Sequence, residues 1–165
     1  MWVIILRHYW GKVIVMIYRK AKITDVEHIH ALITYYAEQD LMLARSRTLL
    51  YESLREFTIV EDQNNVIGAG ALNIVWNDLA EIRALTVAPA YARQGVGRRL
   101  IQTFVEEARE LALPRIFVLT YQQEFFEKCG FQVVPKESLP QKVWKECVNC
   151  PKFPNCEELA MTIDI

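Results

Sequence analysis

The chain has 165 residues, 52% of them hydrophobic, so it is long enough to bury a substantial core and short enough for one domain. Nineteen basic and twenty acidic side chains leave a net charge of -1, which excludes an overall positive field for nucleic acid or an anionic membrane. The apolar N-terminal run is too short for a signal peptide, and no stretch has the roughly 18 uncharged apolar residues of a membrane span. We therefore expect a cytoplasmic protein with one local site.

The first part of the chain is predicted to form a strand, two helices and a hairpin. Residues 1–15 are interpreted as an extension outside a core fold of residues 16–165, or alternatively as an extra edge strand. Thr24 and Glu27 have capping-box spacing ahead of apolar residues at helical intervals, and Ser46 can cap a second helix. The expected elements are, in chain order, a strand at 17–20, a helix at 25–38, a loop at 39–45, a helix from 46 and a hairpin of strands 57–61 and 66–75.

The second part is predicted to alternate strands and helices. Apolar residues recur at helical intervals from Leu100 to Ala108, and Pro114 ends that helix. The expected elements are a strand at 79–87, the amphipathic helix, a strand at 116–119, a helix at 124–128 and strands at 131–134 and 159–165. This order predicts an α/β fold of one domain, with a mixed central β-sheet flanked by helices.

A turn with two glycines connects the strand at 79–87 to the amphipathic helix. Between Pro89 and Leu100 the sequence reads P-A-Y-A-R-Q-G-V-G-R-R-L. Glycine permits backbone angles and a close approach that a side chain prevents. The first N–H groups of the helix have no helical partner and lie at the positive end of its dipole, where phosphate oxygens are favourable ligands. The turn therefore predicts a phosphate site, although two glycines alone are more typical of an ordinary strand-to-helix turn.

Two other phosphate-binding motifs are excluded. The dinucleotide fingerprint needs a third glycine and an acidic residue about 20 positions later, whereas the nucleotide-triphosphate loop needs Gly-Lys followed by Ser or Thr. The turn satisfies neither requirement.

The turn and the segment from Phe125 to Phe131 together resemble the GNAT superfamily of N-acetyltransferases. In that family a Q/R-x-x-G-x-G/A turn binds the pyrophosphate of coenzyme A, and an F-Y-x-K-x-G-F segment follows later in the chain. The resemblance covers nearly all of residues 16–134 and implies acetyl-CoA as cosubstrate. The family's leading Q/R is Ala92 here, and we expect Arg93 to replace that charge. The implied cofactor-binding residues are Leu85, Val87, Arg93, Gln94, Gly95, Val96, Gly97, Arg98 and Phe126.

Acetyl transfer to an amine needs a neutral nucleophile, a polarised thioester carbonyl and a protonated leaving thiol. Glu81, Arg83 and Leu85 alternate along their strand, so we expect them to share a face. The resemblance implies that Glu81 is a general base, acting directly or through water; a solvated ion pair with Arg83 is the alternative. The family's tyrosine is replaced by Phe126, so Tyr121 is the candidate general acid by position, ahead of Cys129. The alternative is that both are packing residues and that the thiol leaves as thiolate or takes a proton from water.

The acceptor is indicated by loop arginines and by three longer segments. Guanidinium groups suit carboxylates, and Arg45 and Arg47 lie in the loop between the first two helices. The segments A-E-I-R-A-L-T-V, L-T-Y-Q-Q-E-F-F-E-K-C-G-F and K-V-W-K-E-C-V-N-C-P-K-F-P-N-C resemble the short, kinase-free N-acetylglutamate synthases of bacterial arginine biosynthesis. This resemblance implies transfer of acetyl to the α-amine of L-glutamate, with Arg45, Ser46 and Arg83 holding its carboxylates.

Three of the four cysteines, Cys147, Cys150 and Cys156, lie near the C-terminus. In a chain without a secretion signal, reduced thiols or a metal site are more typical than disulfides. A zinc site would need a fourth ligand such as Cys129, and buried structural cysteine is the preferred interpretation. We therefore predict no metal.

Other functions stay open at this point. Ala92 and Phe126 are compatible with a catalytically silent domain that binds coenzyme A and has a regulatory role, whereas Glu81 favours an enzyme. Transfer to another amine, such as a protein N-terminus, is a further alternative. The expected partner is a small-molecule amine, and the chain is a candidate homodimer.

Overall fold

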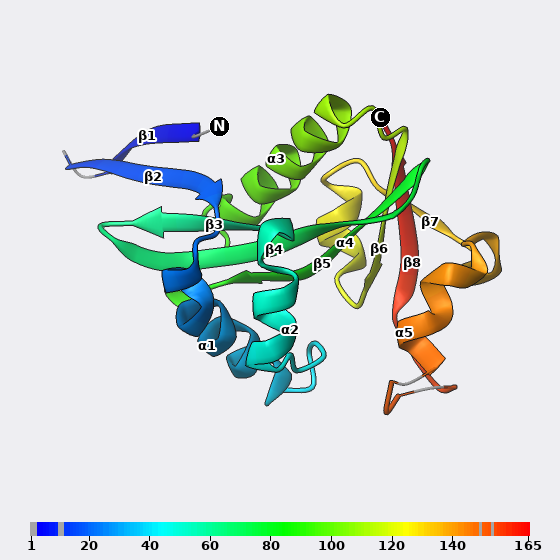
Figure 1. Ribbon diagram of the computed structural model, residues 1–165. Helices are drawn as coiled ribbons and strands as arrows, with labels where there is room; N and C mark the ends of the chain where they lie inside the picture. Colours follow the sequence, from blue (N-terminus) through cyan, green and yellow to red (C-terminus); the bar gives the residue numbers. More distant parts are fainter. Residues whose placement is uncertain (1–2, 10–11, 149, 153) are drawn as a thin grey trace. The chain divides into compact units, whose positions relative to one another are not determined.

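The computed structural model describes residues 3–9, 12–148, 150–152 and 154–165 (Figure 1). The strands are β1 (Val3–Tyr9), β2 (Lys12–Lys20), β3 (Phe57–Asp62), β4 (Asn65–Trp76), β5 (Leu79–Val87), β6 (Arg115–Thr120), β7 (Gln132–Val134) and β8 (Leu159–Asp164). The helices are α1 (Val26–Ala37), α2 (Arg47–Glu52), α3 (Val96–Glu110), α4 (Gln123–Glu127) and α5 (Trp144–Val148). Short 3-10 helices lie at Ile23–Asp25, Leu54–Glu56, Pro89–Tyr91, Lys136–Ser138 and Gln141–Val143.

The sheet contains parallel and antiparallel pairs. Among the described residues its eight strands are hydrogen-bonded in the order β1-β2-β3-β4-β5-β6-β8-β7. Strands β5 and β6 are parallel, while β2 with β3, β3 with β4, and β6 with β8 are antiparallel. The predicted α/β class with a mixed sheet is therefore confirmed.

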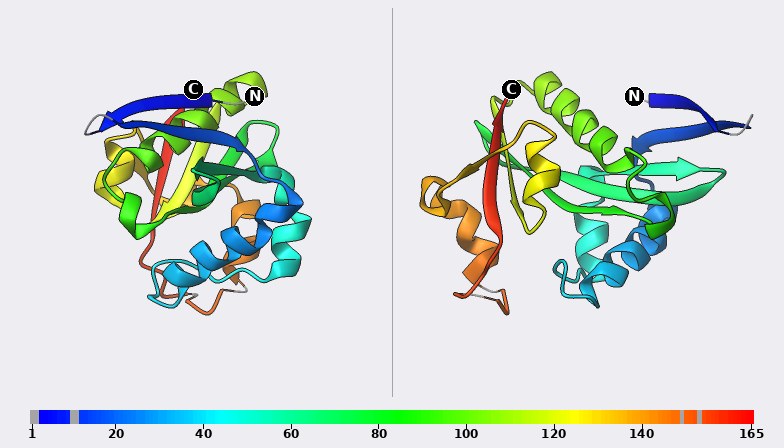
Figure 2. Two further views of the ribbon diagram at one scale, coloured as in Figure 1. Left: turned by 90° about the vertical axis from the view of Figure 1, so that its left-hand side faces the viewer. Right: turned by 180° about the vertical axis from the view of Figure 1, so that it is seen from behind.

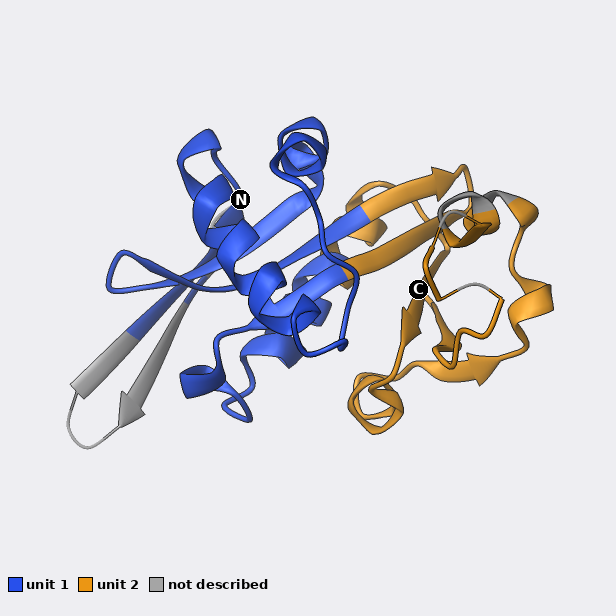
Figure 3. Cartoon of the chain, turned by 90° about the horizontal axis from the view of Figure 1, so that it is seen from below, with its two compact units in different colours: residues 1–72, 84–104 blue, residues 73–83, 105–165 orange. Residues whose placement is uncertain are grey.

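The chain divides into two compact units, which Figure 3 colours separately. Unit 1 comprises residues 1–72 and 84–104, and unit 2 comprises residues 73–83 and 105–165. Strands β4 and β5 and helix α3 each contribute residues to both units.

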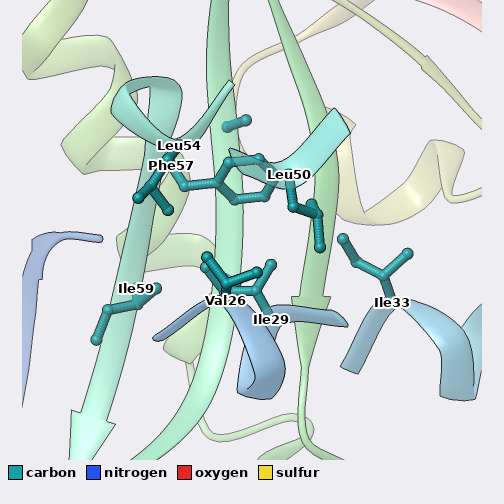
Figure 4. Close-up of a cluster of buried hydrophobic side chains, with 9 residues drawn as sticks. Val26, Ile29, Ile33, Leu50, Leu54, Phe57 and Ile59 are labelled. Carbon is teal, nitrogen blue, oxygen red and sulfur yellow. The ribbon is translucent and has the colours of Figure 1, made fainter. Parts of the chain in front are cut away.

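In unit 1, α1 and α2 cover one face of the strands and the first part of α3 covers the other (Figure 2). Strand β4 alternates accordingly: Ala69 and Ala71 join the cluster under α1 and α2, whereas Gly68 and Gly70 face α3. A Cβ at Gly70 would lie 3.0 Å from the Phe104 ring, so glycine here lets α3 approach closely. The cluster under α1 and α2 is Val26, Ile29, Ile33, Leu50, Leu54, Phe57, Ile59, Ala69 and Ala71 (Figure 4).

A buried ion-pair network joins β2, β3 and the segment before α1. Arg19 Nη1 lies 2.6 Å from Asp25 Oδ2, and Arg19 Nη2 lies 2.7 Å from Glu61 Oε2. Burial raises the pKa of Asp25, but hydrogen bonds from Arg19 and from the Lys22 backbone N–H together lower it by more. The pKa of Asp25 therefore lies below its usual value. This network was not predicted from the sequence; its Glu61 member is 42 positions from Arg19 along the chain.

Unit 2 is built on β6, with β8 and then β7 beside it. On one face a cluster of Leu79, Phe117, Leu139, Val143 and Ala160 is covered by α5, whose Trp144 packs against it. Gly130 has a φ of +95°, which allows the chain to turn sharply between α4 and β7.

The predicted elements agree with the structure except near the N-terminus and before β8. The predicted capping box of Thr24 and Glu27 is wrong: Glu27 binds Arg47, and the Asp25 carboxylate accepts the Lys22 backbone N–H instead. Residues 3–9 form β1, antiparallel to β2, so the predicted boundary at residue 15 falls inside β2. Helix α5 and the two 3-10 helices before it were not predicted.

Candidate active site

The turn between β5 and α3 has backbone angles suited to an anion. Arg93 and Gly95 have φ values of +59° and +83°, both in the left-handed region. Left-handed residues in a turn can point neighbouring N–H groups toward one side and form an anion-binding concavity. The N–H of Arg99 donates to the Gly95 carbonyl at 3.0 Å, so the N–H groups of Val96, Gly97 and Arg98 precede the first intrahelical bond. The turn therefore fits a pyrophosphate.

The side chains around the turn have different roles. Arg93 and Arg98 are exposed and supply positive charge beside the N-terminus of α3. The Gln94 side chain donates from Nε2 to the Ala90 carbonyl at 2.9 Å, so this hydrogen bond stabilises the turn internally. Val96 is buried against the backbone at Gly68, so its side chain is not available to a ligand.

Hydrogen bonds from three elements hold the start of the turn within unit 1. The Tyr36 hydroxyl of α1 donates to the Val87 carbonyl, and the Ala88 N–H donates to the Ile67 carbonyl of β4 at 2.7 Å. The Tyr91 hydroxyl donates to the Asp62 carboxylate of β3 at 2.7 Å. Burial raises the pKa of Tyr36, and the hydrogen bond to Asp62 followed by burial raises the pKa of Tyr91, so both stay donors.

Strand β5 contains a left-handed residue before the turn. Ala84 has a φ of +54° and packs against the cluster under α1 and α2, while Leu85 lies over Gly70 beside Phe104. A left-handed residue within a strand is typical of a β-bulge and interrupts the regular alternation of side chains. The prediction that Glu81, Arg83 and Leu85 share a face assumed regular alternation along β5. The left-handed Ala84 interrupts that alternation before Leu85, so the spacing alone does not place the three residues on one face.

Glu81 and Arg83 lie in the part of β5 that belongs to unit 2 and are both half-buried. Glu81 pairs in register with Phe117 of β6. Burial raises the pKa of the Cys147 thiol in α5, and Cys156 and the Glu81 carboxylate raise it further. The Glu81 carboxylate therefore acts electrostatically on the Cys147 thiol of α5.

Tyr121 follows the end of β6 and is exposed. Its hydroxyl accepts a hydrogen bond from Lys152 Nζ at 3.2 Å, and the same ammonium lies 5.0 Å from the ring centroid. Phe126 is buried in α4, with its ring 5.1 Å from that of Phe125 and 5.3 Å from that of Phe131. This packing explains an apolar aromatic side chain at position 126, and the contact of Phe126 with the cofactor stays a prediction.

The acceptor loop, residues 38–46, connects α1 to α2. Ser46 caps α2 as predicted, since its Oγ accepts the Leu49 N–H at 3.3 Å. Arg45 is half-buried, whereas Arg47 and Glu27 form an exposed ion pair with Nε 2.8 Å from Oε1. Arg47 is thus engaged by Glu27 of α1.

The four cysteines have free thiols and are all half-buried. Within the part of the chain that the structure describes, no three His, Cys, Asp or Glu side chains are grouped so that they could hold a metal ion. The same residues include no helix with the length and apolar character needed to cross a membrane.

The family of the protein follows from comparison with known sequences. Residues 23–131 match the Acetyltransferase (GNAT) family. An uncharacterized N-acetyltransferase of Chlorobaculum tepidum is 36% identical over 143 residues, covering 87% of this chain and 92% of that protein. An amino-acid acetyltransferase of Mycobacterium tuberculosis is 36% identical over 131 residues, covering 78% of this chain and 75% of the relative. The chain therefore belongs to the GNAT family.

Solved structures agree with this assignment. A Mycobacterium tuberculosis protein in complex with CoA and NLQ has a TM-score of 0.79 at 30% identity, covering 90% of this chain and 98% of that one. The N-acetylglutamate synthase of Neisseria gonorrhoeae, complexed with coenzyme A and N-acetyl-glutamate, has a TM-score of 0.83 at 30% identity. This chain covers 35% of that longer enzyme. The protein is an acetyl-CoA-dependent N-acetyltransferase, and the predicted GNAT fold is confirmed.

Proposed function

We propose that the protein transfers the acetyl group of acetyl-CoA to the α-amine of L-glutamate, the first step of bacterial arginine biosynthesis, in the cytoplasm. The observation that carries the cofactor half is the turn, where left-handed Arg93 and Gly95 precede the first N–H groups of α3. The acceptor half is supported by the likeness to an N-acetylglutamate synthase and by an arginine in the acceptor loop. The homodimer stays a prediction.

The proposed chemistry assigns a role to each group. Acetyl-CoA supplies a thioester whose C–S bond is replaced by a C–N bond to the amine. Glu81 acts as general base and takes the proton that the ammonium loses, directly or through water. Tyr121 is the proposed general acid for the leaving sulfur, and its hydroxyl accepts a hydrogen bond from Lys152. Arg45, Ser46 and Arg83 are proposed to hold the glutamate carboxylates.

Replacing Glu81 tests the enzymatic role. Glu81→Gln is expected to lower kcat by roughly 10² to 10⁴ while leaving the affinity for coenzyme A unchanged, because a general base acts only in the chemical step. Steady-state kinetics and calorimetric titration measure the two effects. Glu137→Gln, an exposed residue of unit 2, is the matched control. If kcat of Glu81→Gln stays within about twofold of the wild type, Glu81 is not the base.

The acceptor is tested by comparing glutamate with glutamine, which matches it in size but lacks the side-chain charge. A pocket with an arginine dedicated to that carboxylate should favour glutamate by at least about tenfold in kcat/KM. Equal use of both amino acids would reject the side-chain half of the proposal. Turnover with peptide amines alone would reject glutamate and leave only the acetyltransferase.

A further inference from the structure

Tyr91 joins the turn to the hairpin of β3 and β4. Its hydroxyl donates to Asp62 Oδ2 at 2.7 Å, and Asp62 is buried at the end of β3, where it pairs with Asn65. Tyr91 itself is half-buried and ends the 3-10 helix that opens the turn. A buried carboxylate therefore receives a hydrogen bond from a residue that immediately precedes the expected pyrophosphate contacts.

The residues after Tyr91 need such a contact. Residues 92–95 are exposed, and Arg93 holds a left-handed angle that costs conformational energy for a residue with a side chain. Convergence of the N–H groups depends on the backbone angles of the turn. A turn that is already fixed before binding loses less conformational entropy when the ligand arrives.

The hydroxyl is not required for filling space. Phenylalanine has the same ring as Tyr91 and would retain its apolar contacts, so the oxygen contributes only the bond to Asp62. The start of the turn is also held by Tyr36 and Ala88, which act on positions before Pro89. Tyr91 acts on the side of the turn that leads into Arg93.

We propose that Tyr91 is a positioning residue for acetyl-CoA, whose hydrogen bond to Asp62 fixes the turn that receives the pyrophosphate. The proposal rests on the proposed assignment of the pyrophosphate to residues 93–98. Its consequence is specific to one part of the cosubstrate: Tyr91 contributes to binding of the nucleotide end and not to the acyl transfer.

The test uses two cosubstrates, acetyl-CoA and S-acetylpantetheine, which carries the same thioester but no pyrophosphate. Tyr91→Phe is expected to raise KM for acetyl-CoA by about tenfold with kcat within about twofold, because it removes binding common to ground and transition states. The kcat/KM for S-acetylpantetheine should stay within about twofold. Tyr51→Phe, on the exposed face of α2, is the matched control and should change neither value.

The acceptor side of the bond provides a rescue experiment. Asp62→Asn keeps an oxygen that accepts the Tyr91 hydroxyl, so its KM for acetyl-CoA should rise less than that of Asp62→Ala. Combining Asp62→Asn with Tyr91→Phe should add little to Tyr91→Phe alone, since both changes act on one bond. Thermal melting of each variant verifies that the protein stays folded.

Each outcome decides the proposal. An equal loss with both cosubstrates would mean that Tyr91 supports the fold in general, and an unchanged KM for acetyl-CoA would mean that the bond has no role; either overturns it. The Gly97→Asp variant distinguishes a failure of the Tyr91 proposal from a failure of the pyrophosphate assignment. If Gly97→Asp weakens coenzyme A binding and Tyr91→Phe does not, only the positioning role is wrong. If Gly97→Asp has no effect either, the pyrophosphate binds elsewhere.

Discussion

The turn at residues 88–95 and the acceptor loop at residues 38–46 are both short connections of unit 1 that carry arginine, but they present different chemistry. The turn offers backbone N–H groups whose direction is set by left-handed Arg93 and Gly95 and by the start of α3. The acceptor loop offers side chains, and whether an arginine there can bind a ligand depends on the groups that already bind its guanidinium.

This difference explains why the turn is readable from sequence and the loop is not. Glycines between a strand and a helix constrain the backbone locally, so the motif carries its own geometry. An arginine has no such constraint: Arg47 is bonded to Glu27, which precedes it by an entire helix. Charge alone therefore overstates how many arginines in a loop serve a ligand.

The sharpest test of the backbone site is Gly97→Asp, which adds a negative side chain beside the expected phosphate. Coenzyme A affinity should fall about tenfold to a hundredfold or more, equivalent to about 1.5 to 3 kcal/mol. Gly97→Ala is the matched control: residue 97 lies in α3, so alanine fits the backbone and introduces no charge. Calorimetric titration distinguishes the two variants, and an unaltered affinity for a folded Gly97→Asp protein contradicts the assignment.

The acceptor loop is tested by paired arginine variants. Arg45→Ala should raise KM for glutamate by about tenfold or more through loss of a charge-assisted hydrogen bond, with little change in KM for acetyl-CoA. Arg47→Ala should change KM for glutamate by less than about twofold, because that guanidinium is bound to Glu27. A larger effect from Arg47→Ala than from Arg45→Ala would reverse the roles and show that the ion pair opens for the substrate.

The smallest expected effect concerns the Arg47–Glu27 pair itself. Both side chains are exposed, and solvent screens such pairs strongly, so Glu27→Gln should shift the melting temperature by no more than about 2 °C. That shift should disappear in 1 M salt. A larger, salt-independent shift would indicate that the pair has a structural role in joining α1 to α2.

Most of the fold is predictable because hydrophobic periodicity is a local property. The hairpins, the amphipathic helix α3 and the cap at Ser46 follow from residues close together in the chain. The bonds of Tyr91 to Asp62 and of Arg19 to Glu61 join residues far apart in sequence, so no local pattern reveals them. The left-handed Ala84 is also hidden, since alanine carries no signal for that conformation.

The same holds within the candidate site. The phosphate turn was found because its glycines and its position after a strand are visible in sequence. The surroundings of Glu81 were not predicted, because α5 and Cys147 come from the C-terminal segment, where the sequence indicated cysteines but no helix. Tyr121 was selected by position, and its contact with Lys152 needed the tertiary structure.

The positive φ of Arg93 implies a trade-off between stability and activity. A left-handed conformation suits glycine better than arginine, so Arg93→Gly should make the turn easier to form and raise the melting temperature. It should also remove a cation from the site and weaken binding of the cosubstrate. Selection for thermal stability alone would therefore favour a variant that is the poorer enzyme, and a screen for improved robustness should include turnover at limiting acetyl-CoA.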